Sequence, residues 1–152
     1  MHHKRTPSIR NYSDLITGIA PIFRLNVPKN EVHLIGTGFW ITRTGHLVTA
    51  WHVVEENIDT DGVDRGPIFA VQTFPDRSAA VRNFSKSDKH PEFDLALSET
   101  VAAPPFKERP TEPLTMSLDE LKADQPVFSF AMLSNVQTFE NESVPGRTIF
   151  RF

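Results

Sequence analysis

One stretch of the sequence, GTGFWITRTGHLVTAWHVV over residues 36–54, limits what this chain can fold into more than any other part does. It overlaps residues 34–41, a β-branched and aromatic run with two glycines, which predicts a strand in close backbone contact with its neighbours. Residues 43–45 end in glycine, where a three-residue hairpin loop needs a left-handed residue. Residues 47–50 predict the returning strand, and His52 follows its end. The sequence therefore predicts a β-hairpin that presents a histidine at the edge of a loop.

Short β-type runs separated by turns continue on both sides of this hairpin. Residues 53–58 favour one helical turn, residues 75–78 a tight turn, and residues 85–91 a polar loop. The 12 prolines and 12 phenylalanines disfavour a helical bundle. Together these features predict an all-β fold with a small, closed or nearly closed Greek-key β-barrel. The predicted strands cover residues 14–25, 34–41, 47–50, 68–74, 79–84 and 93–97.

The sequence after residue 100 predicts a connector and a second sheet. Residues 102–113 are rich in proline and predict an extended connector, because the proline ring fixes the backbone angle φ. Residues 127–133 and 147–152 are apolar runs typical of strands, and residues 117–120 have capping-box spacing for a helical turn. The predicted organisation is a flexible arm over residues 1–13, a first β-barrel over 14–100, a proline-rich connector over 101–116 and an incomplete second β-barrel over 117–152.

Composition excludes several classes of protein. A chain of 152 residues with 39% hydrophobic and 23% charged residues suits one globular domain. The net charge of −3 comes without any basic block, so we expect neither a nucleic-acid nor a membrane partner. There is no cysteine, and His2 and His3 lack partners at metal-ligand spacing, so we expect no disulfide, no metal and no cofactor. Neither a signal peptide nor a membrane span is predicted, which favours a cytoplasmic location.

Two motifs resemble those of one known family. G-T-G-F-W-I, a hairpin and then L-V-T-A-W-H-V-V resemble the histidine motif of the trypsin-like (chymotrypsin-fold) serine peptidases, of the disulfide-free bacterial type. H-P-E-F-D-L-A-L at residues 90–97 resembles the aspartate motif of the same family. The motifs come in the family's order and at a spacing that the family tolerates. The resemblance extends over about residues 16–133 and implies a chymotrypsin-like first barrel, an incomplete second barrel and a polypeptide substrate.

The resemblance implies catalytic roles for His52 and Asp94. In such an enzyme a serine hydroxyl attacks the peptide carbonyl, a histidine takes the hydroxyl proton, and an aspartate orients that histidine. His52 would be the base and Asp94 the orienting acid. Asp94 stands between Phe93 and Leu95 at the start of a predicted apolar strand, where a carboxylate is costly to bury without a partner. His90, in the polar loop before a proline, is the competing candidate for the base.

The serine motif of the family, G-D/N-S-G-G, is missing from this sequence. No serine has a glycine neighbour, and there is no cysteine to replace it as a nucleophile. Ser129, Ser134 and Ser143 therefore lack the glycines that let backbone amides form an oxyanion hole. The resemblance implies that the nucleophilic serine and the missing C-terminal barrel lie beyond residue 152. The 152-residue chain alone is accordingly expected to be inactive.

Two classes of function remain open. The first is a trypsin-like serine endopeptidase, represented here by the half that carries His52 and Asp94. The second is a non-catalytic β-barrel binding module of the same type, a pseudo-peptidase. If the pair acts as base and acid, a carboxylate oxygen of Asp94 should lie about 2.6–3.2 Å from Nδ1 of His52. A pairing of Asp94 with Arg82 or Lys89 instead would mean that the motifs resemble the family in sequence only.

Overall fold

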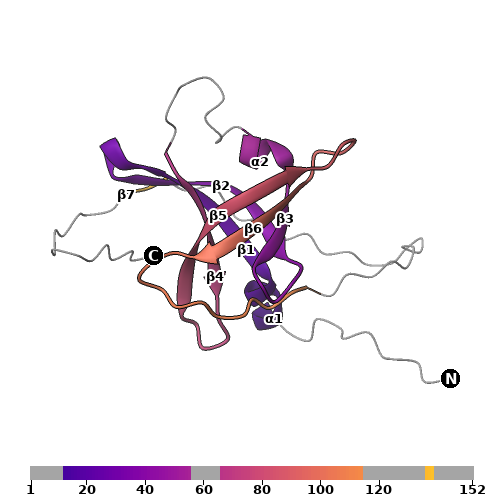
Figure 1. Cartoon of the computed structure of the whole chain (residues 1–152). Coiled ribbons are helices and arrows are strands. Elements are labelled where there is room, and N and C mark those ends of the chain that lie inside the picture. Colours follow the sequence, from indigo (N-terminus) through magenta and orange to yellow (C-terminus); the bar gives the residue numbers. More distant parts are fainter. Residues whose placement is uncertain (1–11, 56–65, 115–135, 139–152) are drawn as a thin grey trace.

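The computed structural model describes residues 12–55, 66–114 and 136–138 of the chain, and it is built mostly of strands (Figure 1). Within these ranges, no helix has the length and apolar character needed to cross a membrane. In chain order the elements are α1 (Tyr12–Gly18), β1 (Ile19–Asn26), the 3-10 helix η1 (Val27–Lys29), β2 (Glu31–Trp40), β3 (His46–Thr49), α2 (Trp51–Glu55), β4 (Ile68–Thr73), β5 (Ala79–Lys89), β6 (Ala96–Ala102) and β7 (Val136–Thr138).

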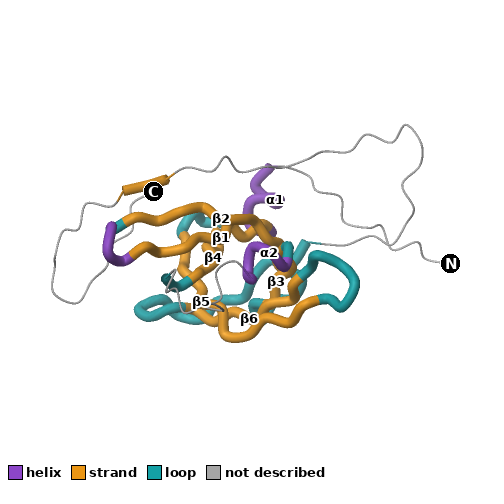
Figure 2. The backbone as a smooth tube through the Cα atoms, turned by 90° about the horizontal axis from the view of Figure 1, so that it is seen from above, coloured by secondary structure: helices purple, strands orange, loops and turns teal. Residues whose placement is uncertain are grey.

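Six strands close into an antiparallel barrel, which confirms the expectation of a β-barrel. Their order around the ring is β1, β2, β3, β6, β5 and β4, and β4 pairs with β1 again. Figure 2 shows the barrel from above, and Figure 1 shows α2 and α1 at its upper and lower ends. Strand β7, which was not predicted, pairs with residues 31–33 of β2. The short β3 pairs with β2 only at Phe39 and Trp40, so β7 adds to a part of β2 that β3 does not cover.

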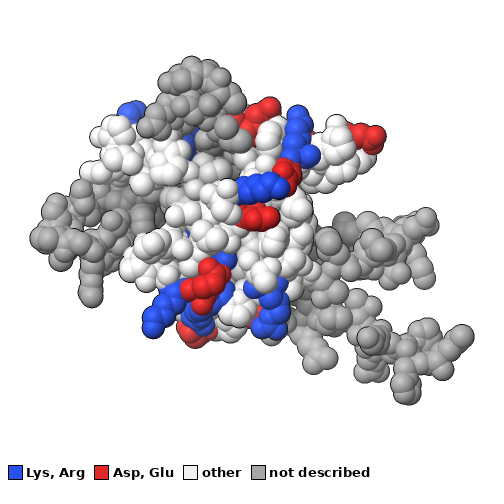
Figure 3. Space-filling view, in the orientation of Figure 1, with Lys and Arg blue, Asp and Glu red and all other residues white. Residues whose placement is uncertain are grey.

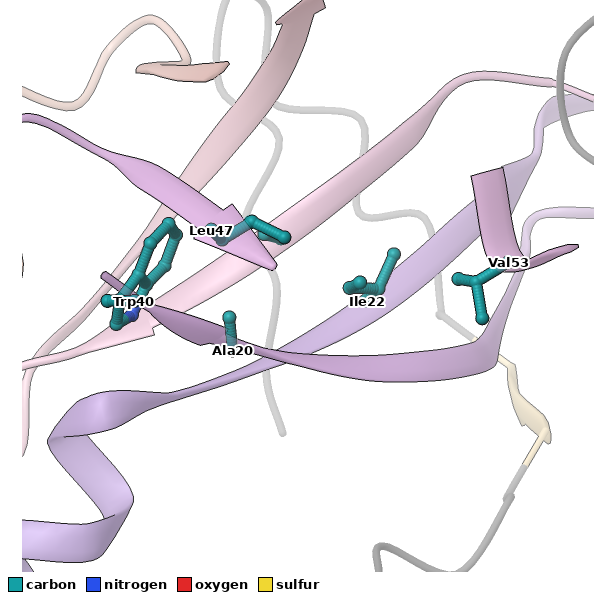
Figure 4. Close-up of a cluster of buried hydrophobic side chains, with 6 residues drawn as sticks. Ala20, Ile22, Trp40, Leu47 and Val53 are labelled. Carbon is teal, nitrogen blue, oxygen red and sulfur yellow. The ribbon is translucent and has the colours of Figure 1, made fainter. Parts of the chain in front are cut away.

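Two clusters of apolar side chains form the core of the barrel. Side chains alternate along a strand, and β6 shows this clearly: residues 96, 98 and 100 are buried and residues 97, 99 and 101 are exposed. The first cluster contains side chains from β1, β2, β3, β4 and α2. It consists of Ala20, Ile22, Trp40, Leu47, Val53 and Ala70 (Figure 4). The second consists of Val32, Phe69, Val71, Val81 and Ala103. Since Val53 belongs to the first cluster, α2 is packed onto the same core as the strands.

A buried arginine ties the connector to the barrel. The side chain of Arg82 is 1% exposed; it donates hydrogen bonds to Thr100 Oγ1 at 2.9 Å and to Gln72 Oε1 at 3.0 Å. Its Nη2 lies 2.6 Å from Oε1 of Glu108, a connector residue. The Nε2 of Gln72 donates in turn to the carbonyl of Pro110 at 2.8 Å. The connector therefore lies against the barrel and is held there by polar contacts to its interior.

Charged side chains of both signs are interspersed on the face shown in Figure 3. On β5, Nζ of Lys86 lies 2.7 Å from Oδ2 of Asp88. Between the connector and the β4–β5 turn, Nη2 of Arg109 lies 3.6 Å from Oδ2 of Asp76. In each pair the two opposite charges neutralise each other locally.

The structure corrects the predicted start of the first strand. Residues 14–18 were expected in a strand, but they belong to α1. Gly18 ends this helix, and a Cβ atom there would overlap the side chain of Leu114. The glycine that suggested a strand therefore serves a close helix–connector contact instead.

The structure also corrects two predicted segments around the β5–β6 loop. Residues 85–89, predicted as part of a polar loop, continue β5 as far as Lys89, which pairs with Ala96. Their side chains are mostly open to water, and pairing with β6 satisfies the backbone, so polarity does not stop the strand. Residues 93–95, predicted as strand, lie in the β5–β6 loop, with Phe93 60% and Leu95 43% exposed.

Candidate functional site

His52 and Asp94 meet because the strands next to them pair. β3 ends at Thr49 and β6 begins at Ala96, and these two residues are direct antiparallel partners. The chain that leaves β3 therefore runs beside the chain that enters β6. Nδ1 of His52 lies 2.6 Å from Oδ2 of Asp94, within the predicted hydrogen-bond distance. The catalytic roles of the two residues stay a prediction.

Asp94 holds His52 at a second atom. The backbone N–H of His52 donates to Oδ1 of Asp94 at 3.0 Å, while the ring uses the other oxygen. Because an ionised carboxylate can only accept, Nδ1 of the ring carries the proton in this arrangement. The carboxylate therefore fixes the position, the orientation and the tautomer of the imidazole.

The helix α2 has a buried side and an exposed side. Val53 and Val54 are 5% and 2% exposed, whereas the side chain of His52 is 58% exposed. The N–H of Val53 donates to the carbonyl of Ala50 at 3.2 Å, which closes the turn between β3 and α2. Packing of the two valines thus directs His52 outward, where another molecule can reach it.

The G-T-G motif of the hairpin makes room for α2. A Cβ atom at Gly36 would lie 2.6 Å and 2.7 Å from the two Cγ atoms of Val53. A Cβ atom at Gly38 would lie 2.8 Å from a carbonyl oxygen of β3. Between the glycines, the carbonyl of Thr37 accepts a hydrogen bond from Oγ1 of Thr49 at 3.0 Å. The motif therefore sets how closely β2 approaches β3 and the helix that carries His52.

Asp94 lies in a tight loop between β5 and β6. The N–H of His90 donates to the carbonyl of Leu95, and the N–H of Leu95 donates to the carbonyl of Phe93, both at 2.8 Å. Nδ1 of His90 accepts the N–H of Glu92 at 3.1 Å. His90, the competing candidate for the base, thus uses Nδ1 inside the loop. Within the described residues, no hydrogen bond or ion pair joins it to Asp94.

The pKa of Asp94 lies below its ordinary value of 3.8. The largest cause is the hydrogen bond from the His52 side chain, followed by the backbone N–H of His52, and the N–H of Trp51 contributes as well. The Asp94 side chain is 57% exposed, so water screens the pair and it contributes little to stability. Burial therefore does not explain the pair, contrary to the expectation from the apolar neighbours of Asp94.

The two cations that could have competed for Asp94 have other contacts. The buried Arg82 pairs with the exposed Glu108 of the connector. Nζ of Lys89 lies 5.5 Å from the centroid of the Trp51 ring, a cation–π arrangement at the start of α2. Neither cation pairs with Asp94. The pairing that would have meant a resemblance in sequence only is therefore not found among the described residues.

Residue types alone did not reveal every partner of Asp94. The backbone N–H groups of Trp51 and His52 both point to its carboxylate. Any residue supplies an N–H, so only the geometry of α2 identifies them.

Among the residues that the structure describes, no group of three or more His, Asp or Glu side chains could hold a metal ion. Ser129, Ser134 and Ser143 lie outside these residues.

Comparison with known proteins finds no family model that matches the chain and no curated protein that matches it significantly. The geometry of His52 and Asp94, together with the barrel that holds them, is therefore the basis for assigning a function.

Proposed function

We propose that this chain is the half of a trypsin-like serine endopeptidase that supplies the base and the orienting acid. The observation that carries the proposal is the distance of 2.6 Å between Nδ1 of His52 and Oδ2 of Asp94. Peptide-bond hydrolysis by a Ser-His-Asp triad needs this hydrogen bond, because it sets the tautomer that can take a proton at Nε2. The proposed substrate is a polypeptide.

The arrangement of the strands supports a chymotrypsin-like Greek key. β1, β2 and β3 are neighbours in chain order, and β4 lies beside β1, so the spatial order is β4, β1, β2, β3. This order is that of a Greek key. The histidine follows the third strand and the aspartate precedes the sixth, as the resemblance to the trypsin-like family implies.

In the proposed reaction, a serine hydroxyl attacks the carbonyl carbon of the substrate and transfers its proton to Nε2 of His52. Asp94 keeps the proton on Nδ1 and stabilises the imidazolium that forms. His52 then gives the proton to the leaving amine. The serine and the donors of the oxyanion hole would come from the part of a second barrel that lies outside this sequence.

The exposure of the pair fits an unfinished active site. His52 is 58% and Asp94 57% exposed. A second barrel placed over this face would remove water from the pair. Hydrogen bonds and charges act more strongly when water is excluded, so the second barrel would strengthen the orientation of His52 as well as supply the nucleophile.

A second candidate function is a non-catalytic binding module. Asp94 also accepts the backbone N–H of His52 at the start of α2, at 3.0 Å. A carboxylate in this position caps the helix, which gives Asp94 a structural role even without a serine. The missing serine motif agrees with this alternative as well.

Expression of the complete reading frame that contains this sequence separates the two functions. The endopeptidase proposal expects a G-x-S-G-G motif after residue 152 and hydrolysis of a fluorogenic peptide mixture by the whole product. The 152-residue chain alone should remain at background. A reading frame that stops after Phe152, or a whole product that cleaves nothing while its serine motif is intact, would favour the binding module.

A further inference from the structure

His90 is built into the loop that carries Asp94. Its Nδ1 accepts two backbone hydrogen bonds, from the N–H of Glu92 at 3.1 Å and from the N–H of Phe93 at 3.2 Å. The ring of Phe93 packs against the imidazole, with centroids 4.9 Å apart and an interplanar angle of 37°. Both amides belong to the turn that leads directly into Asp94.

The apolar side chains of the loop do not hold its shape. Phe93 and Leu95 are 60% and 43% exposed, so they are not anchored in the core. The main-chain bonds from His90 to Leu95 and from Leu95 to Phe93, both 2.8 Å, close the loop around Asp94, and the Asp94 carboxylate bonds to the ring and the backbone N–H of His52. The two bonds to the His90 ring order the turn that precedes Asp94.

We propose that His90 is a positioning residue that orients Asp94 toward His52. Its Nδ1 accepts the amides two and three residues ahead, which is the hydrogen-bond pattern of an Asx turn, with imidazole nitrogen in place of the Asn or Asp oxygen. Through the loop, His90 determines where the Asp94 carboxylate lies. The importance of this position for catalysis rests on the proposed function, but the positioning itself does not.

The role requires a neutral His90. A protonated imidazole carries N–H on both nitrogens and can accept no hydrogen bond, so protonation removes both bonds to the loop. Within the described residues no charged side chain forms an ion pair with His90; the charged residues beside it in the chain are Asp88, Lys89 and Glu92. Protonation of His90 would therefore loosen the Asp94 loop.

Three variants of the 152-residue chain test the proposal. His90→Asn restores an acceptor at the Asx-turn position without a titrating ring, whereas His90→Phe keeps a ring against Phe93 without an acceptor. His90→Ala removes both. The readouts are the hydrogen exchange of the Glu92 and Phe93 amides and the NMR signal of the Nδ1 proton of His52, at pH 8.

We expect His90→Phe and His90→Ala to raise exchange of the two amides about ten-fold at pH 8 and to weaken the His52 Nδ1 signal. His90→Asn, which keeps an acceptor, should keep both readouts as in the wild type at the same pH. Wild-type readouts in His90→Phe, or a loss of protection in His90→Asn as large as in His90→Phe, would overturn the proposal.

None of these readouts needs catalysis. If the complete product proves to be no peptidase while His90→Phe still disturbs the loop, the positioning role stands and the proposed function fails. If the product is a peptidase and His90→Phe leaves the His52 signal unchanged, the positioning role fails alone.

Discussion

Gly36 of β2 packs directly against Val53, the residue that follows His52 in α2. A Cβ atom on Gly36 would lie 2.6 Å and 2.7 Å from the two Cγ atoms of that valine. This contact connects the glycine motif of the hairpin to the placement of the histidine. Gly36 thus acts on the site through its packing against Val53.

Gly36→Ala is predicted to destabilise the barrel by about 1–3 kcal/mol through overpacking. Val53→Ala removes both Cγ atoms and is destabilising by itself through lost packing. The double variant should be more stable than the sum of the two single effects, because the alanine at position 36 then has space. Urea unfolding of the four proteins gives the coupling energy. Strict additivity would show that the contact does not position α2.

Replacement of the buried Arg82 by methionine should lower the free energy of unfolding. The Oε1 of Gln72 and the Oγ1 of Thr100 would each lose the hydrogen bond that Arg82 donates in the interior, at a cost of about 1–3 kcal/mol. Arg43→Met is a matched control, because Arg43 is 68% exposed and should change stability by no more than about 0.5 kcal/mol. Equal midpoints for the two variants in urea would contradict the anchoring role of Arg82.

The acid titration of Asp94 should depend on His52. The pKa of Asp94 is below 3.8 mainly because of the His52 side chain, so His52→Ala should raise it toward that value. Because the pKa is lowered in the folded state, the pair stabilises the fold above pH 3.8, and this contribution is lost as the pH falls through the lowered pKa. Carbon NMR of the carboxyl group checks the shift. An identical Asp94 titration in His52→Ala would mean that the imidazole is not its partner.

The hairpin could be predicted from a local pattern, and the His–Asp contact from the resemblance of the two motifs to those of the trypsin-like family. A β-branched and aromatic run and a glycine-ended loop predict the β2–β3 hairpin within a few residues. His52 and Asp94 lie close together because β3 and β6 pair. Thr49 at the end of β3 is the partner of Ala96 at the start of β6, and His52 follows Thr49 while Asp94 precedes Ala96.

Other features could not be predicted because they depend on tertiary contacts. The polar residues 85–89 form strand because β6 pairs with them, which nothing in their own composition indicates. Gly18 ends α1 against Leu114, a residue far away in the sequence. The role of His90 depends on loop geometry, and the sequence suggested only a competing base.

Labelling of the complete product with a serine-directed phosphonate tests the central claim most directly, namely that His52 is the base of a serine peptidase. We expect one serine, outside these 152 residues, to be labelled, and His52→Ala to slow the labelling by about 10²–10⁴-fold, the usual contribution of a general base. His33→Ala, on the half-buried histidine of β2, should label at the wild-type rate. No labelling of the intact product, or equal rates for His52→Ala and wild type, would contradict the claim.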